Sequence, residues 1–249
     1  MPNPPVHTFF ALKLIGELND PVLNEFSAQM ILGSTAPDIR AITNMNRDQT
    51  HFAPLSSEKI DEGVKSLFAS QPNFLPLRSV PEPTQAFIVG YMSHLIMDQI
   101  WISKMYRRFF SNSDLFPNQV TANVMDRALQ MCMDQEANPY AEETLTLLEN
   151  SEKDIDIPFI PKESLETWRE WMQNRFSRGF SWDRLNFMAQ RRQDDDSKVS
   201  AESVATEFLN SLPDSLNKLY AIIPWDHVEE YQNFTMEESK RIIKEYLEI

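Results

Sequence analysis

Residues 84–110 read TQAFIVGYMSHLIMDQIWISKMYRRFF and form the longest apolar-periodic segment of the chain. The segment is too long for a β-strand, and its apolar residues cover most faces of a helix. Its part over residues 86–102 is about long enough to cross a bilayer, but His94 and Asp98 lie near the middle of that part and the basic residues Lys104, Arg107 and Arg108 follow it. The pattern therefore predicts the buried central helix of a bundle, with polar side chains inside the protein, and no transmembrane segment.

The segments on both sides of this helix also have helical periodicity. Apolar residues recur three or four positions apart, prolines fall between the periodic segments, and only 5 glycines occur. Besides residues 84–110, the expected helices are 6–18, 21–32, 57–70, 121–136, 141–150, 164–178, 200–212 and 235–247. Residues 34–57 lack a sustained period and are expected to form a loop with one helical turn. No alternating run indicates a sheet, so the predicted fold class is all-α.

The chain length fits a single domain. A single hydrophobic core can accommodate 249 residues, of which 42% are hydrophobic and 24% charged. We expect one helical domain over residues 1–249, in which residues 1–110 form the metal-site core and residues 111–249 are a helical extension that completes the bundle. Gly90 lowers helix propensity by about 1 kcal/mol relative to Ala. We therefore expect it to allow a neighbouring helix to approach closely.

The charge balance and the cysteine count restrict the function. The sequence has 23 Lys and Arg against 37 Asp and Glu, which gives a formal net charge of −14. Such a surface repels polyanions, so nucleic acid is disfavoured as a partner and a zwitterionic or small phosphoester is favoured. The single cysteine, Cys132, permits no intrachain disulfide and no thiolate metal cluster. Residues 1–20 lack a basic leader, so we expect a cytoplasmic protein.

His94 and Asp98 are the sharpest local feature. They are four positions apart on the predicted central helix, so both side chains leave the same face one turn apart. This geometry can chelate one metal ion. His-x-x-x-Asp is also a loose pattern, and the two side chains can instead hydrogen-bond each other inside the bundle. The pair alone leaves both interpretations open.

Three further candidates lie earlier in the chain. Asp38 ends the sequence TAPD, in which the proline favours a turn, His51 lies in the same predicted loop, and His7 lies on the first predicted helix. Each has an ordinary alternative, since Asp38 can cap a helical turn, His51 can be an exposed loop residue and His7 a core histidine. No spacing ties His227 to these residues, and we leave it out of the predicted metal set.

Four motifs, taken together and in this order, resemble those of a known family. They are His7 in the first helix, GSTAPD at residues 33–38, THF at residues 50–52 and AFIVGYMSHLIMDQIW at residues 86–101. In these motifs the chain resembles the zinc-dependent phospholipase C proteins, which are similar to the single-strand-specific zinc nucleases. The resemblance covers roughly the first 105 residues, and the joint pattern is more specific than any one motif.

This resemblance implies a multi-helix bundle of the zinc-dependent phospholipase C type with a helical C-terminal extension. It implies that Asp38, His51, His94 and Asp98 ligate one zinc ion and that His7 and Asp98 reach a second. Imidazole and carboxylate groups are common zinc ligands. The implied reaction is hydrolysis of a phosphodiester, in a small phosphoester or a phospholipid, by metal-activated water. Asp38 is the candidate catalytic residue, and the sequence leaves open whether it acts as a ligand, as a proton acceptor or as both.

The sequence also departs from the family pattern. The three-metal members carry a further histidine and a His-x-x-x-Glu pair after the central helix, and residues 105–226 contain no histidine. We therefore expect one or two zinc ions and no third. With these ligands missing, two alternatives stay open: a metal-stabilised, non-catalytic binding or assembly module, and a metalloenzyme with non-hydrolytic chemistry.

Overall fold

The computed structural model describes residues 1–111, 114–190 and 199–248. Across these residues all regular structure is helical, which confirms the predicted all-α class. The α-helices are α1 (Pro4–Leu18), α2 (Pro21–Glu25), α3 (Ser27–Gly33), α4 (Arg47–His51), α5 (Glu62–Ser70), α6 (Glu82–Ile100), α7 (Gln119–Ala137), α8 (Ala141–Leu147), α9 (Lys162–Ser177), α10 (Arg184–Gln190), α11 (Ala201–Asn210), α12 (Asp214–Ile222) and α13 (Trp225–Leu247). The shorter 3-10 segments are η1 (Ala36–Ala41), η2 (Pro72–Phe74), η3 (Leu77–Ser79) and η5 (Asn138–Tyr140).

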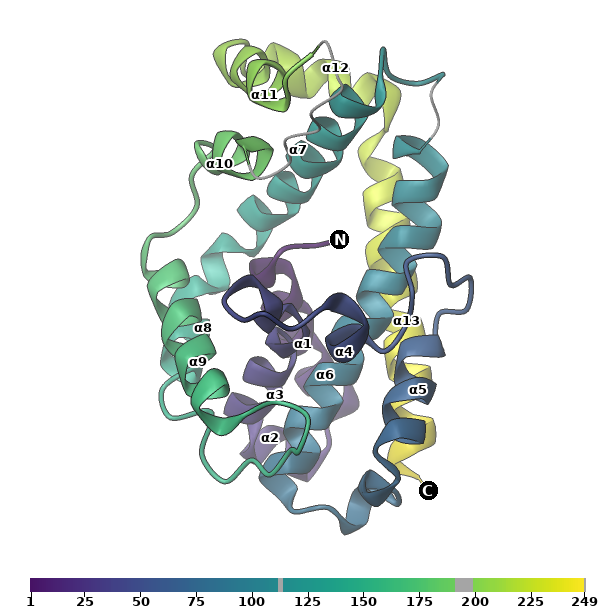
Figure 1. Cartoon of the computed structure of the whole chain (residues 1–249), viewed down its shortest axis with the longest axis vertical. Helices are drawn as coiled ribbons and strands as arrows, with labels where there is room; N and C mark the ends of the chain where they lie inside the picture. The colour runs from purple at the N-terminus through teal and green to yellow at the C-terminus, as the bar shows by residue number, and fades with distance from the viewer. Residues whose placement is uncertain (112–113, 191–198, 249) are drawn as a thin grey trace.

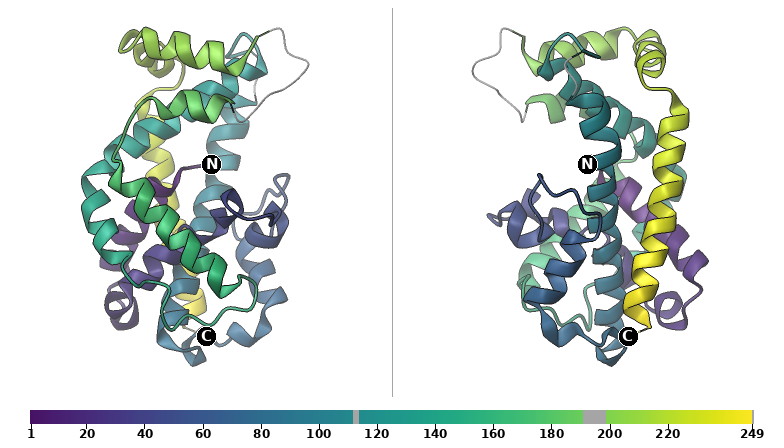
Figure 2. Two further views of the ribbon diagram at one scale, coloured as in Figure 1. Left: turned by 60° about the vertical axis from the view of Figure 1, so that its left-hand side comes forward. Right: turned by 90° about the vertical axis from the view of Figure 1, so that its right-hand side faces the viewer.

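Helix α6 is the centre of the bundle. Every residue from Thr84 to Ile100 is buried, and the helix continues as a π-helical segment, η4 (Trp101–Phe110). Helices α1, α3 and α5 pack against α6, and α13 runs antiparallel along it (Figures 1 and 2). No helix in the described ranges is long and apolar enough to span a membrane. The predicted buried central helix is therefore confirmed.

Two glycines allow the backbones of α3 and α6 to touch. A Cβ atom on Gly90 would lie 2.0 Å from the carbonyl oxygen of Met30, and one on Gly33 would lie 2.1 Å from the carbonyl oxygen of Phe87. Only residues without a side chain fit at this crossing. The close approach expected at Gly90 is confirmed, and it brings Ser34 next to α6.

The structure corrects several predicted boundaries. The helix expected over residues 21–32 is divided at Phe26, whose φ of −104° and ψ of 36° interrupt the helical backbone. Its apolar pattern continues through that residue and so does not reveal the break. The last helix begins at Trp225 rather than at residue 235, and the expected loop over residues 34–57 contains both η1 and α4. Helices α10 and α12 were not predicted, because such short helices give weak periodic signals.

Candidate metal centre

Helix α6 places His94 and Asp98 one turn apart at the centre of the bundle. Their side chains are 0% and 2% exposed, and His94 Nε2 lies 3.5 Å from Asp98 Oδ2. The separation is too long for a hydrogen bond. Of the two interpretations that the sequence left open, a hydrogen-bonded pair is therefore not what the structure contains.

Helix α1 brings His7 to the same carboxylate. His7 Nε2 lies 3.5 Å from Asp98 Oδ1, and the side chain is 1% exposed. Its ring stacks on the ring of His94, with 3.8 Å between the centroids and 11° between the planes. The stacked rings direct two imidazole Nε2 atoms towards opposite oxygens of one carboxylate.

The short helix α4 supplies His51, its last residue. Asn46 caps this helix by accepting a hydrogen bond from the backbone N–H of Gln49, and Phe52 ends it with a φ of 55°. The hydroxyl of Tyr91 on α6 donates a hydrogen bond to the carbonyl of Thr50, which ties α4 to the central helix. His51 Nε2 lies 3.2 Å from Asp98 Oδ2.

Asp38 lies on η1 and completes the predicted set. Its Oδ1 atom is 3.8 Å from His51 Nε2, and its side chain is 26% exposed. The indole N–H of Trp168 on α9 donates a hydrogen bond of 3.1 Å to the hydroxyl of Thr35, which holds the start of η1 in place. Asp38 is thus the one predicted site residue with substantial access to solvent.

The polar atoms at the centre of this cluster are suited to a metal ion. Among the described residues, the Nε2 atoms of His7, His51 and His94 and both oxygens of Asp98 are buried and have no hydrogen-bond partner. Such atoms are rare in folded proteins. Donor atoms that share a tetrahedral zinc ion at about 2.0–2.1 Å lie about 3.3 Å from one another. The separations of 3.2–3.5 Å around Asp98 match that spacing.

Two overlapping groups of residues can each hold an ion. His7, His94 and Asp98 form one group, and Asp38, His51 and His94 form the other, with the ligating atoms of each group within 4.8 Å of one another. The residues present therefore fit zinc.

Neighbouring oxygens orient two of the imidazole rings. His94 Nδ1 lies 2.8 Å from the carbonyl oxygen of Ser34, which can only accept, so Nδ1 carries the proton and Nε2 presents its lone pair. His51 Nδ1 lies 2.9 Å from the hydroxyl of Thr50. A partner of this kind on the far nitrogen is typical of metal-ligating histidines.

The pKa shifts favour the ligand forms of His7, His51 and Asp98. Burial lowers the pKa of His94, but the charge of Asp98 outweighs burial and raises that pKa above its usual value, so a metal ion must displace a proton from His94. Burial, together with the neighbouring His94, lowers the pKa of His7 to about 4, and burial lowers the pKa of His51. Burial alone would raise the pKa of Asp98, but the surrounding imidazoles outweigh it and hold that pKa well below its usual range. His7 and His51 are therefore neutral and Asp98 ionised at neutral pH, which are the forms that bind metal ions.

Comparison with known families identifies the chain. The family model for zinc-dependent phospholipase C matches residues 6–182. The chain belongs to this family. The match extends well past the motifs in the first part of the chain and includes all five residues of the cluster. No curated protein and no solved structure matches the chain.

The sequence patterns did not reveal several residues around this candidate metal centre. Arg47 Nη2 lies 3.8 Å from Asp98 Oδ2, and the only local signal for it is its position four residues before His51 on one helix face. Ser34 and Thr50 lie within quoted motifs, but their contacts with the imidazoles arise only when the helices pack. His227 was left out of the predicted set, and the structure places it beside Glu230 and Phe109 on the outer part of the bundle.

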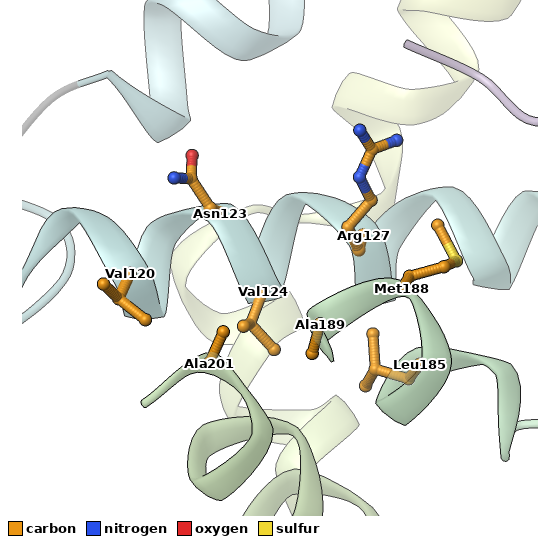
Figure 3. A pocket seen from close by; sticks show the side chains of 8 residues that line it. All are labelled: Val120, Asn123, Val124, Arg127, Leu185, Met188, Ala189 and Ala201. Carbon is orange, nitrogen blue, oxygen red and sulfur yellow. The ribbon is translucent and has the colours of Figure 1, made fainter. Parts of the chain in front are cut away.

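A separate apolar pocket of this family member lies between α7, α10 and α11 (Figure 3). Its lining residues are Val120, Asn123, Val124, Arg127, Leu185, Met188, Ala189 and Ala201. Asn123 and Arg127 project from α7 away from the apolar side chains in this view. None of these described lining residues belongs to the cluster around Asp98, so the pocket is distinct from it.

Proposed function

We propose that this protein is a zinc-dependent hydrolase that cleaves a phosphodiester, in a phospholipid or a small phosphoester. The observation that supports it most directly is the set of buried imidazole and carboxylate atoms around Asp98 that have no hydrogen-bond partner among the described residues. The chain's membership of the zinc-dependent phospholipase C family supports the reaction class.

In this proposal the five side chains His7, Asp38, His51, His94 and Asp98 hold one or two zinc ions. Asp98 lies between the imidazoles, and His94 belongs to both groups of ligands. Zinc, when bound, supplies a Lewis acid that lowers the pKa of water and neutralises charge on a phosphoryl oxygen. The carbonyl of Ser34 and the hydroxyl of Thr50 keep two imidazole rings oriented.

In this proposal Asp38 accepts the proton of the attacking water. It is the partly exposed carboxylate of the cluster, whereas Asp98 is enclosed by imidazoles. A carboxylate that adjoins both the ligands and solvent can accept the proton of the attacking water as the water oxygen bonds to phosphorus. The P–O bond to the leaving alcohol breaks in the same reaction, and the proton then passes to that alkoxide. Asp38 therefore acts as a ligand, as a general base, or as both, and one variant separates these roles.

The test combines metal analysis with turnover. Purified protein is expected to contain one or two equivalents of zinc and to hydrolyse phosphatidylcholine vesicles or a chromogenic phosphodiester. Chelation, His94→Ala and Asp98→Asn should each remove both zinc and turnover. His227→Ala is the matched control, since it removes a histidine outside the cluster, and it should retain both. Zinc-loaded protein without turnover on either substrate would instead favour the non-catalytic module.

The Asp38→Asn variant distinguishes the two roles of Asp38. Full zinc content with turnover reduced about 100-fold or more assigns Asp38 as the general base. Loss of zinc in this variant assigns it as a ligand. Full zinc content with unchanged turnover would remove Asp38 from the mechanism.

A further inference from the structure

Among the described residues, Arg47 is the one lysine or arginine that contacts the carboxylate of Asp98. It begins α4, four residues before His51, so both side chains lie on one face of that helix. Its Nη2 atom lies 3.8 Å from Asp98 Oδ2, and its side chain is only 14% exposed. Arg47 therefore places a fixed positive charge beside the candidate metal ligands.

The guanidinium group is held through Nη1 and more weakly through Nη2, and its Nε donor is unpaired in the part of the chain that the structure describes. Nη1 donates a hydrogen bond of 2.7 Å to the carbonyl of Ala53, and Nη2 lies 3.3 Å from Sδ of Met1, a weak acceptor. Within the described ranges the buried Nε atom has no hydrogen-bond partner. A buried charged donor without an acceptor costs free energy, so its presence requires an explanation.

A purely structural role for Arg47 does not explain this geometry. An arginine that serves as the counter-ion of a carboxylate makes hydrogen bonds of about 2.7–2.9 Å, often in pairs. The contact with Asp98 is 3.8 Å, whereas His51 approaches the same oxygen to 3.2 Å. Asp98 is thus aligned with the imidazoles, and Arg47 stands beside it with donors that remain available.

We infer that Arg47 binds a phosphoryl oxygen of the substrate directly at the metal centre. The inference rests on the proposed function, because the phosphoryl group is the part of a phosphodiester that must meet the ligands. The planar guanidinium presents Nε and Nη2 side by side, and two parallel N–H donors match two oxygens of a phosphate. In a chain with a net charge of −14, a positive group at this point also favours the approach of an anion.

The test compares Arg47→Gln and Arg47→Lys with Arg40→Gln. Arg40 is an exposed arginine on η1. Burial lowers the pKa of Arg47, and the charge of Arg40 is close enough to lower it further. Removal of Arg40 therefore changes the electrostatic field at the centre and leaves the guanidinium group of Arg47 in place. Zinc content is measured first and should be unchanged in all three variants. Binding of inorganic phosphate to the zinc-loaded proteins is then measured by calorimetry, independently of turnover.

We expect Arg47→Gln to weaken phosphate binding about 10- to 100-fold, the usual range for a hydrogen bond to a charged group. Arg47→Lys should fall between Gln and the wild type, because lysine keeps the charge but not the fork of donors. Arg40→Gln should change the affinity less than about threefold, as expected for an exposed charge. Equal losses in Arg40→Gln and Arg47→Gln would overturn the inference, and so would loss of zinc in both Arg47 variants.

Two substrate arms separate the sources of the phosphoryl group. For Arg47→Gln, KM should rise for a soluble chromogenic phosphodiester and for phosphatidylcholine vesicles alike. A rise confined to vesicles would assign Arg47 to the lipid surface and contradict the inference. Arg47-dependent phosphate binding without turnover would refute the proposed hydrolase activity and leave the role of Arg47 standing. Turnover that does not depend on Arg47 would support the hydrolase activity and refute the role of Arg47.

Discussion

Replacement of Gly90 by alanine tests how the crossing of α3 and α6 supports the metal centre. The new Cβ would lie 2.0 Å from the carbonyl oxygen of Met30 and 2.9 Å from the backbone nitrogen of Ser34. These are backbone atoms, so α3 must retreat by roughly 1 Å or more to restore normal contact. Overpacking of this kind typically costs about 1–3 kcal/mol or more, and alanine returns only about 1 kcal/mol of helix propensity. Because the clash is with backbone atoms, we take the upper end of that cost, about 3 kcal/mol, and expect a net loss of about 2 kcal/mol.

Gly16→Ala is the matched control for this substitution. Gly16 lies on α1 and is exposed, and a Cβ atom added to it would meet nothing within 4 Å among the described residues. The same change there should stabilise the protein by up to about 1 kcal/mol. Urea unfolding of the zinc-free proteins measures both variants. If Gly90→Ala and Gly16→Ala shift the unfolding midpoint by the same amount in the same direction, the close backbone contact at Gly90 is refuted.

The same variant should also weaken zinc binding. Retreat of α3 moves the carbonyl oxygen of Ser34 away from His94 Nδ1, the nitrogen from which it accepts a hydrogen bond at 2.8 Å. Loss of such an orienting partner typically lowers metal affinity about 10- to 100-fold. Competition with a chromophoric chelator measures this affinity. Destabilised Gly90→Ala protein with unchanged zinc affinity would show that Ser34 does not orient His94.

Three further predictions concern residues outside the centre. Burial raises the pKa of Asp134 to about 7 although Arg175 lies 3.7 Å away, so folding stability should fall as pH rises from about 4 to 7. Asp134→Asn removes this titration and should stabilise the protein by about 3 kcal/mol more at pH 8 than at pH 5. Urea unfolding at the two pH values measures the difference. Burial raises the pKa of the Cys132 thiol to about 11, so a thiol reagent at pH 8 should label folded protein more than about 100-fold more slowly than unfolded protein. Asp20 accepts hydrogen bonds from the backbone nitrogens of Val22 and Leu23 and forms an ion pair with Arg78. Asp20→Ala should therefore lower the free energy of unfolding by about 1–2 kcal/mol, measured as a lower Tm. An unchanged Tm would contradict the capping role.

The long helices could be predicted from the sequence because burial repeats along them. Residues 84–110 are apolar on most faces, and every residue from Thr84 to Ile100 is buried. The last helix was predicted only from residue 235, although it begins at Trp225, because its first turns carry many polar residues. The division of residues 21–32 at Phe26 has no local signal, since apolar side chains continue through it. Periodicity therefore reports which faces are buried and not where the backbone bends.

The ligands could be predicted because their spacing is local or their motifs are specific. His94 and Asp98 share a helix face, and Asp38 and His51 lie in short motifs of a family pattern. Arg47 has no such pattern. Its proximity to Asp98 depends on Tyr91 anchoring α4 to α6 through the carbonyl of Thr50, a contact between residues 41 positions apart in the chain. Residues that act through tertiary contacts of this kind cannot be identified from spacing alone.

The position of the cluster within the bundle links metal binding to folding. Each buried polar atom without a partner costs about 1–3 kcal/mol, and the cluster gathers several of them on the helix against which α1, α3, α5 and α13 pack. An ion that satisfies these atoms together would stabilise the packing of the whole bundle and not only one loop. Asp38 on η1 and Arg47 at the start of α4 lie instead at the edge of the cluster, on short segments. The long helices α1 and α6 thus carry His7, His94 and Asp98, while the short helix α4 carries both the enclosed His51 and Arg47, and η1 carries Asp38, the most exposed residue of the cluster.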